Sequence, residues 1–236
     1  MTGGKWCYPG SDVLINRYDI HDKILLGKLE TQKLMTKILS LDVSPARVKT
    51  TFDTKHLISV HKYLFEDIYE WAGKIRDENL YKAERVLSGG SAEYSDYQKI
   101  EEELNSLFSF YGRLNWTKQT DLAITVSNFL LSLWSIHPFR EGNTRTCVTF
   151  LWHYLNAKKI IFNATLLREN PQYVRDALVM ANYDNKKHLI RIISDALKDF
   201  SNMKRYKVLH EEATEQYQIA KTDYEAFRNK YSVKRK

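Results

Sequence analysis

The sequence contains few of the residues that break helices. Of its 236 residues, nine are glycine and four are proline. Because these two residues are the strongest local signals for turns, their scarcity argues against many short strands and favours long helices. Hydrophobic residues make up 43% of the chain, which is enough for one domain with a substantial core.

Cysteines and long apolar runs are scarce as well. The two cysteines, Cys7 and Cys147, are too few for a disulfide framework. The most apolar run, residues 122–136, includes threonine, serine and asparagine. It is also shorter than the about 20 apolar residues that cross a bilayer. This run therefore predicts a buried helix, and no membrane is expected as a partner.

The N-terminal residues, MTGGKWCYPG, have no apolar run behind their lysine, so they do not read as a signal peptide. We expect a cytoplasmic protein. A route that leaves no N-terminal mark would also allow secretion into a host cell as an effector.

The net charge is +7 at pH 7 and the isoelectric point is near 9.2. Such a balance suits nucleic acid, an anionic membrane or a nucleotide. The surplus is partly local, because residues 229–236 read NKYSVKRK, and a solvated lysine-rich surface explains it equally well. Nucleic acid is therefore not the expected partner.

Apolar residues recur with helical spacing over most of the chain, whereas residues 74–95 show no such period and predict a loop or a short hairpin. Residues 1–20 are expected to be irregular. Residues 201–236 are charged and predict an exposed helix or a linker. The predicted helices cover residues 22–41, 53–72, 96–113, 121–136, 143–156, 170–180 and 186–200.

Polar residues with possible chemistry gather in one loop, HPFREGNTRT, residues 137–146. Pro138 disfavours helical geometry at His137, so the apolar helix should stop there and leave the imidazole at a helix end instead of deep inside. Phe139 is expected to anchor the loop in the core. Gly142 permits an unusual backbone shape, and Asn143 can cap the following helix.

The start of that helix has the properties of an anion site. Its free N–H groups and positive dipole end favour an anion, and Arg145 in the first turn is easier to explain beside a phosphate. Glu141 is a hard oxygen ligand, and a carboxylate together with substrate phosphates is how Mg²⁺ is usually held. His137 can accept a proton from a hydroxyl. Together these groups suit phosphoryl or nucleotidyl transfer.

Each residue also has a simpler interpretation. A single histidine at a helix end is often structural, and Glu141 with Arg145 could be a surface pair contributing about 0.3–0.5 kcal/mol. Cys147 fits a small buried hydrophobe better than a nucleophile. Neither the HExxH zinc pattern nor a Walker-type phosphate loop occurs. The order of the residues is more specific than any one of them.

That order resembles the Fic family motif, His-x-Phe-x-Asp/Glu-Gly-Asn-Gly-Arg-x-x-Arg, over residues 137–148. Residues 8–16, 52–76 and 170–184 resemble other segments of the family, so the likeness extends over about residues 8–200. It implies an all-α fold, a Fic-type helical bundle with a short β-hairpin flap. It also implies three parts: an N-terminal segment 1–20, a Fic domain 21–200 with flap 76–91, and a charged C-terminal helix or tail 201–236.

The resemblance further implies a protein adenylyltransferase, which moves AMP from ATP to a serine, threonine or tyrosine hydroxyl of a target protein. ATP would be the substrate and Mg²⁺ the cofactor. The flap would hold the target backbone by strand addition. The implied roles are: general base, His137; magnesium ligand, Glu141; nucleotide contacts, Gly142, Asn143, Thr144, Arg145, Asn182 and Tyr183; target docking, Lys82, Val86 and Leu87.

Two residues depart from the motif. Thr144 replaces the second glycine, which adds a Cβ near the expected phosphate, although its hydroxyl could serve as a donor or cap. Val148 replaces the second arginine, which in the family contacts the γ-phosphate, so the triphosphate loses a bidentate partner. The base, the metal ligand and the first arginine remain, which favours an active site.

Two other functions stay open at the level of sequence. One is a kinase of the Doc type with an inverted nucleotide, although such motifs carry lysine where Thr144 stands. The other is a nucleotide-binding Fic module with weak or altered transferase activity that acts mainly as an interaction protein. The family's inhibitory pattern matches only residues 165–170, just before a core helix, which we interpret as coincidence. A small antitoxin-like inhibitor protein is therefore a possible partner.

Overall fold

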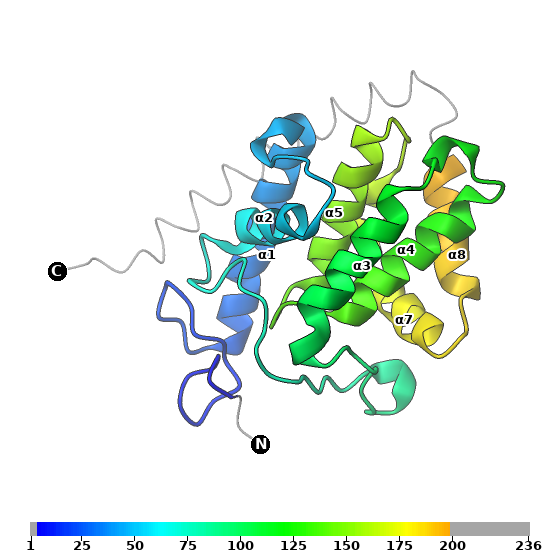
Figure 1. The fold of residues 1–236 in the computed structure, drawn as a ribbon. Helices are drawn as coiled ribbons and strands as arrows, with labels where there is room; N and C mark the ends of the chain where they lie inside the picture. The colour runs from blue at the N-terminus through cyan, green and yellow to red at the C-terminus, as the bar shows by residue number, and fades with distance from the viewer. Residues whose placement is uncertain (1–3, 199–236) are drawn as a thin grey trace. The chain divides into compact units, whose positions relative to one another are not determined.

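The computed structural model describes residues 4–198, and Figure 1 shows that they are mainly helical. Within these residues there is no strand ladder, only isolated antiparallel bridges between Cys7 and Leu14 and between Ala83 and Ser91. The α-helices are α1 Lys23–Val43, α2 Thr54–Phe65, α3 Ile100–Gly112, α4 Leu122–Ile136, α5 Asn143–Ala157, α6 Ala164–Glu169, α7 Pro171–Asn182 and α8 Lys187–Lys198. The short 3-10 helices are η1 Pro45–Arg47, η2 Arg85–Leu87, η3 Tyr97–Lys99 and η4 Trp116–Lys118.

The described residues form two compact units. Unit 1 comprises residues 4–48 and 61–74, and unit 2 comprises residues 49–60 and 75–198. No helix of the described residues has the length and hydropathy needed to cross a membrane. The predicted charged tail, residues 201–236, lies outside the described residues.

Unit 1 is built around α1. The Asp22 side chain accepts a hydrogen bond from the Leu25 N–H and so caps the helix start. The Tyr69 hydroxyl donates to Glu30 at 2.6 Å, and the rings of Trp6 and Trp71 pack edge to face at 5.6 Å. The first contact holds the turns after α2 against α1, and the second packs the irregular N-terminal segment on the same turns.

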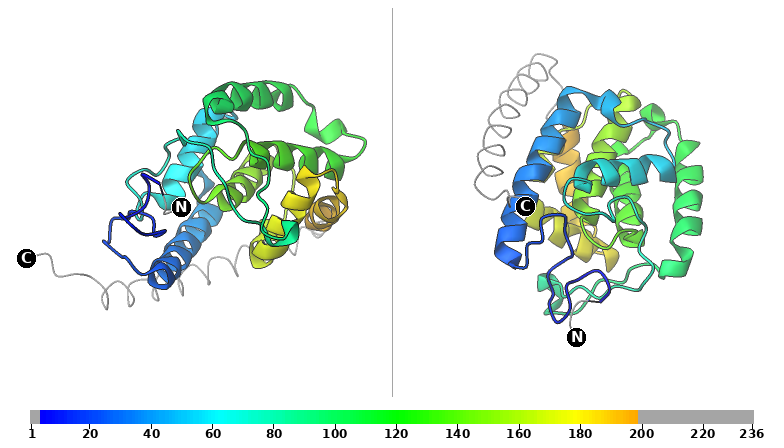
Figure 2. Two further views of the ribbon diagram at one scale, coloured as in Figure 1. Left: turned by 90° about the horizontal axis from the view of Figure 1, so that it is seen from below. Right: turned by 90° about the vertical axis from the view of Figure 1, so that its left-hand side faces the viewer.

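Unit 2 is built around α4, which begins after Asp121, whose side chain accepts from the Ile124 N–H. The helix packs against α3, α5, α7 and α8, and it lies between α3 and α8 (Figures 1 and 2). Phe129, Leu133 and Trp134 on α4 are fully buried. The most apolar segment of the sequence is thus a core helix, as predicted.

One predicted helix boundary is wrong, and one short helix is missing from the prediction. The predicted helix 53–72 ends earlier, because α2 stops at Phe65 and residues 66–73 form turns. In those turns Ile68 O accepts from the Arg17 N–H at 2.8 Å, and the Gly73 N–H donates to His61 Nδ1 at 2.8 Å. These tertiary contacts replace hydrogen bonds of a continued helix. The short helix α6 was also not predicted.

The β-hairpin expected over residues 76–91 is not confirmed. Apart from the bridge between Ala83 and Ser91, the Glu84 N–H donates to Gly90 O at 2.8 Å. Between them the chain forms η2 and then Ser88 in a left-handed conformation. The segment therefore closes as a tight irregular loop, which we call the flap loop (residues 76–91).

Candidate active site

His137 lies directly after the last residue of α4, in a left-handed backbone conformation with φ 50° and ψ 57°. Such a conformation is unfavourable for most side chains and persists only when neighbouring contacts hold it. Arg76 provides these contacts: its Nε donates to His137 O at 2.8 Å and its backbone N–H donates to Pro138 O at 2.8 Å. Arg76 is itself 1% exposed.

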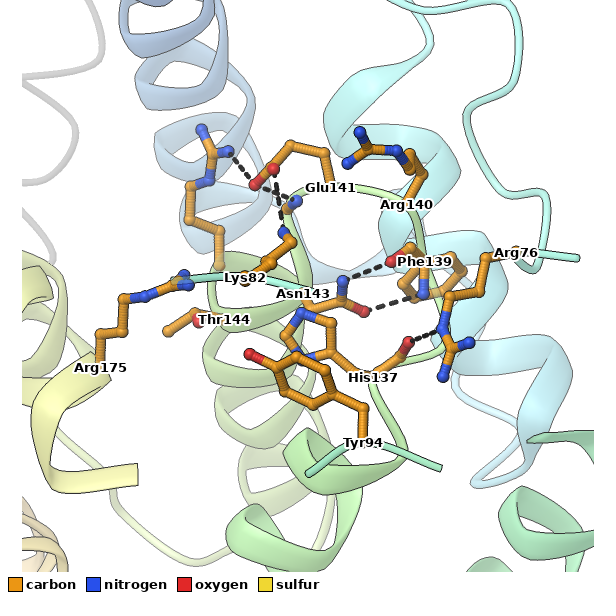
Figure 3. A network of polar contacts seen from close by, with 12 residues as sticks. Arg76, Lys82, Tyr94, His137, Phe139, Arg140, Glu141, Asn143, Thr144 and Arg175 are labelled. Carbon is orange, nitrogen blue, oxygen red and sulfur yellow. Dashed lines mark hydrogen bonds and ion pairs between the residues drawn. The ribbon is translucent and has the colours of Figure 1, made fainter. Parts of the chain in front are cut away.

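The imidazole is buried, which corrects the expectation that ending α4 at this point would keep it out of the interior. His137 is only 1% exposed. The Tyr94 ring stacks on it with centroids 3.8 Å apart, and the Trp134 ring meets it edge-on at 5.4 Å. Tyr94 comes from the segment after the flap loop, so the sequence around His137 could not reveal this cover (Figure 3).

The two ring nitrogens of His137 have different surroundings. Nδ1 lies 3.2 Å from Trp134 O, and because a carbonyl can only accept, Nδ1 carries the proton. Nε2 is buried and has no hydrogen-bond partner among the described residues. Burial lowers the pKa of His137 well below 6.5, and the positive charge of Lys82 lowers it further. The ring is thus neutral, with the lone pair on Nε2 available to accept a proton.

The loop between α4 and α5 is held by Phe139 and Asn143. Phe139 is fully buried, which confirms its predicted role as an anchor. The Asn143 side chain accepts from the Phe139 N–H at 2.9 Å and donates to Phe139 O at 2.6 Å (Figure 3). The prediction that Asn143 caps α5 is therefore wrong: Gly142, at φ 77°, is the cap residue and Asn143 is the first helical residue.

The start of α5 is open to an acceptor. No side chain caps it. The N–H groups of Asn143 and Thr144 lie in the first turn, where no preceding turn supplies carbonyl acceptors. Together with the positive end of the helix dipole they favour an anion. This helix start is therefore compatible with the predicted phosphate contacts, which stay a prediction.

Glu141 lies between two cations. Lys82 Nζ is 3.0 Å from its Oε2 (Figure 3), and Arg145 Nη2 is 3.6 Å from its Oε1. Burial alone would raise the pKa of Glu141, but the charges of Lys82 and Arg145 and the Gly142 N–H hold it well below its usual range. Lys82, which is predicted to dock the target, lies against Glu141 in this structure, and its side chain is 14% exposed.

A magnesium ion would find one carboxylate here. Residues 4–198 contain no group of three or more histidine, cysteine, aspartate or glutamate side chains arranged to hold a metal. The ionised Glu141, next to a helix start that favours phosphate, fits an ion that takes its other ligands from phosphates and water. Lys82 donates to Oε2, so a metal at this carboxylate would share or replace that contact.

Thr144, the first departure from the motif, has a defined contact. Its Oγ1 accepts a hydrogen bond from the Trp134 indole Nε1–H at 2.9 Å. Trp134 is fully buried, so this N–H needs an acceptor. The hydroxyl therefore ties the start of α5 to the residue whose carbonyl orients His137. Val148, the second departure, is 5% exposed and leaves no cation at its position.

The remaining predicted residues lie at the edge of the site. Asn182 Nδ2 donates to Glu93 O at 3.0 Å, and the Tyr183 hydroxyl donates to Ser91 O at 3.2 Å. Both side chains thus connect the end of the flap loop and the residues after it to the C-terminal end of α7. Val86 and Leu87 are half-buried within η2. The contacts of Asn182 and Tyr183 with adenine, and of Val86 and Leu87 with a target, stay predictions.

Four residues that the sequence did not single out complete the site: Arg76, Tyr94, Trp134 and Arg175. Arg76, Tyr94 and Arg175 come from segments far from the loop along the chain, and Trp134 reads as one more apolar residue of a core helix. Only the fold brings Arg76, Tyr94 and Arg175 close to His137 and Glu141.

Three findings connect the chain with known proteins. Residues 51–155 match the Fic/DOC family. The protein y4lH of Sinorhizobium fredii, named "Probable protein adenylyltransferase", is 36% identical over 149 residues, which are 61% of this chain and 71% of that protein. VbhT of Bartonella schoenbuchensis, named "Protein adenylyltransferase", is 26% identical over 200 residues, 85% of this chain but only 40% of that longer protein.

Solved structures share the fold. The BepC protein of Bartonella tribocorum with bound AMPPNP superposes with a TM-score of 0.69 at 22% identity, covering 83% of this chain and 97% of that one. The Fic domain of Bep8 from Bartonella sp. 1-1C gives 0.67 at 22%, covering 86% and 99%. The family match across the motif, and an identity of 36% over most of a relative, show that this chain belongs to the Fic/DOC family.

Proposed function

We propose that the protein is an adenylyltransferase that moves AMP from ATP to a hydroxyl side chain of a target protein. The observation that carries the proposal is the orientation of His137. Its Nδ1 donates to Trp134 O, and its buried Nε2 has no hydrogen-bond partner among the described residues. The start of α5, which no side chain caps, lies next to this ring (Figure 3). A neutral imidazole held in this way can act as a general base, because its Nε2 lone pair can accept a proton. The relatives named protein adenylyltransferases support the same activity.

The reaction can be written with these groups. Nε2 of His137 takes the proton of the target hydroxyl as its oxygen attacks the α-phosphorus of ATP. The bond from the α-phosphorus to the oxygen bridging to the β-phosphate breaks, and diphosphate leaves with that electron pair. The products are AMP esterified to the target and diphosphate.

The start of α5 would hold the phosphates through the N–H groups of Asn143 and Thr144, and Arg145 would offset charge on the distal phosphates. Glu141 would hold magnesium, which neutralises phosphate charge when bound. Lys82 would leave Glu141 on nucleotide binding. We propose that it then docks the target together with Val86 and Leu87, by strand addition to the flap loop.

The test uses ATP labelled at the α-phosphate, incubated with the full chain, magnesium and a lysate. Labelled protein is expected with the native chain and with His21→Ala, which removes an exposed histidine of unit 1. His137→Ala should abolish the label. Equal labelling by His137→Ala, or no label with the native chain, contradicts the proposal. In a parallel reaction with ATP labelled at the γ-phosphate, labelled protein there but not with the α-label would indicate a Doc-type kinase.

The burial of His137 favours a second candidate, a nucleotide-binding Fic module that acts mainly as an interaction protein with weak or altered transfer. Calorimetry with ATP and magnesium, combined with the labelling assay, separates the two, because such a module binds nucleotide but transfers little or no AMP to protein. A small antitoxin-like inhibitor and delivery as an effector stay predictions for either candidate. Co-purification from the native host is the test for the inhibitor.

A further inference from the structure

A cation from a third element lies near the proposed phosphate site. Figure 3 shows the side chain of Arg175 extending from α7 towards Lys82 and Thr144. Burial lowers the pKa of Lys82, Glu141 partly offsets this, and the positive charge of Arg175 lowers it further. The charge of Arg175 thus acts within the site, although no motif assigns a role to this residue.

The guanidinium of Arg175 is held in a fixed orientation. Its Nε donates to Glu84 Oε2 at 2.9 Å and its Nη2 donates to Glu84 Oε1 at 2.6 Å. Glu84 is only 3% exposed, and the Tyr94 hydroxyl donates to its Oε1 at 3.2 Å. A bidentate pair with a buried, doubly engaged carboxylate fixes the plane of the guanidinium.

This pair leaves donors of Arg175 unused. A guanidinium has five N–H groups, and the contacts with Glu84 use one on Nε and one on Nη2. Both N–H groups of Nη1 and the second one of Nη2 donate no hydrogen bond to the described residues. The Arg175 side chain is 29% exposed, so an anion can reach it.

The charges around this point are unequal. Lys82 from the flap loop, Arg145 from α5 and Arg175 from α7 face two carboxylates, Glu141 and Glu84. Half-buried cations in excess of their acidic partners are costly unless an anion completes the cluster. Three cations against two carboxylates leave one positive charge in excess, so the cluster favours an anionic group.

We propose that Arg175 is a phosphate-binding residue that contacts the β- and γ-phosphates of a nucleoside triphosphate, in place of the arginine absent at Val148. This inference rests on the proposed function, because it places the triphosphate at the start of α5. Glu84 and Tyr94 act as positioning residues that orient the Arg175 donors.

A neighbouring ion pair provides a matched control. Arg85 in η2 contacts Asp176 in α7, so it joins the same two elements with the same type of charge. The Arg85 side chain is 71% exposed. If Arg175 only fastened the flap loop to α7, Arg85→Gln and Arg175→Gln would have similar effects on nucleotide binding.

The experiment measures binding of AMPPNP, ADP and AMP with magnesium to the full chain by calorimetry. In Arg175→Gln, loss of a charge-assisted hydrogen bond should weaken AMPPNP and ADP about tenfold to a hundredfold. AMP should bind nearly as to the native chain, and Arg85→Gln should bind all three unchanged. Arg175→Lys, which keeps the charge but not the fork, should be intermediate.

The double variant Glu84→Gln/Arg175→Gln leaves no buried charge unpaired and is expected to show the same selective loss if the single variant does not fold. Native affinity for AMPPNP in a folded Arg175→Gln, an equal loss for AMP, or no nucleotide binding by the native chain overturns the inference. Triphosphate binding that depends on Arg175 but gives no labelled target contradicts the transferase function alone. Labelled target with unchanged binding in Arg175→Gln contradicts this inference alone.

Discussion

Replacing Thr144 with valine tests how the start of α5 supports the base. Valine keeps the shape of threonine and the backbone N–H, but removes the Oγ1 that accepts from Trp134 Nε1 at 2.9 Å. Trp134 is fully buried, so its indole N–H would lose its acceptor with no access to water. The same residue accepts the His137 Nδ1–H through its carbonyl, so a shift of Trp134 also misplaces the imidazole.

The expected loss of stability follows from that unsatisfied donor. Leaving a buried polar group without a partner costs about 1–3 kcal/mol. For a protein of this size each kcal/mol lowers Tm by about 2–4 °C, so Thr144→Val should melt about 2–12 °C below the native chain. Thr144→Ser keeps the hydroxyl and should lose much less. In the transfer assay Thr144→Val should lower kcat more than it raises KM for ATP.

A double-mutant cycle with Trp134→Phe isolates the hydrogen bond. Phenylalanine has no indole N–H, so Thr144→Val should cost little stability when it is introduced into Trp134→Phe. Urea unfolding of the four proteins gives the coupling free energy. A loss from Thr144→Val that is equal in both backgrounds, or equal stability of Thr144→Val and the native chain, would refute the reasoning.

Three further predictions concern buried groups. Burial lowers the pKa of His137 well below 6.5 and that of His56 to about 4, so below pH 6.5 the unfolded chain binds more protons than the folded one. The free energy of unfolding, measured in urea, should fall from pH 6.5 to pH 5 by up to about 1.4 kcal/mol per pH unit for each histidine. An equal free energy of unfolding at pH 6.5 and at pH 5 contradicts this. Lys82→Met removes a positive charge that disfavours the imidazolium form of His137. In the native chain the acidic limb of the pH profile of kcat/KM should lie below pH 6.5, and in this variant it should move towards 6.5. An acidic limb that does not move argues against His137 as the base. Cys147 is fully buried, and burial raises its pKa, so a thiol reagent should modify it only after the protein is unfolded in urea. If the folded protein reacts at Cys147 as fast as a free thiol does, the burial is contradicted.

The pattern of apolar residues determined much of the fold. The predicted helix 121–136 is α4, and its apolar face is buried because helical spacing decides which side chains share a face. Prediction failed where tertiary hydrogen bonds replace local ones, as after Phe65, and where a bridge and a 3-10 turn form instead of a hairpin, as at Ala83 and Ser91. Local propensity cannot weigh contacts between distant segments.

For the site, the sequence by itself determined the loop from His137 to Arg145, because a helix end, a glycine turn and a helix start are local features. Only the tertiary structure decided which nitrogen of His137 is free, that Tyr94 covers the ring, and that Lys82 lies on Glu141. Tyr94 and Lys82 come from segments far away along the chain, whose positions depend on how the helices pack. A charge or ring changes the chemistry of its neighbour only through distance and burial, and the fold alone sets both.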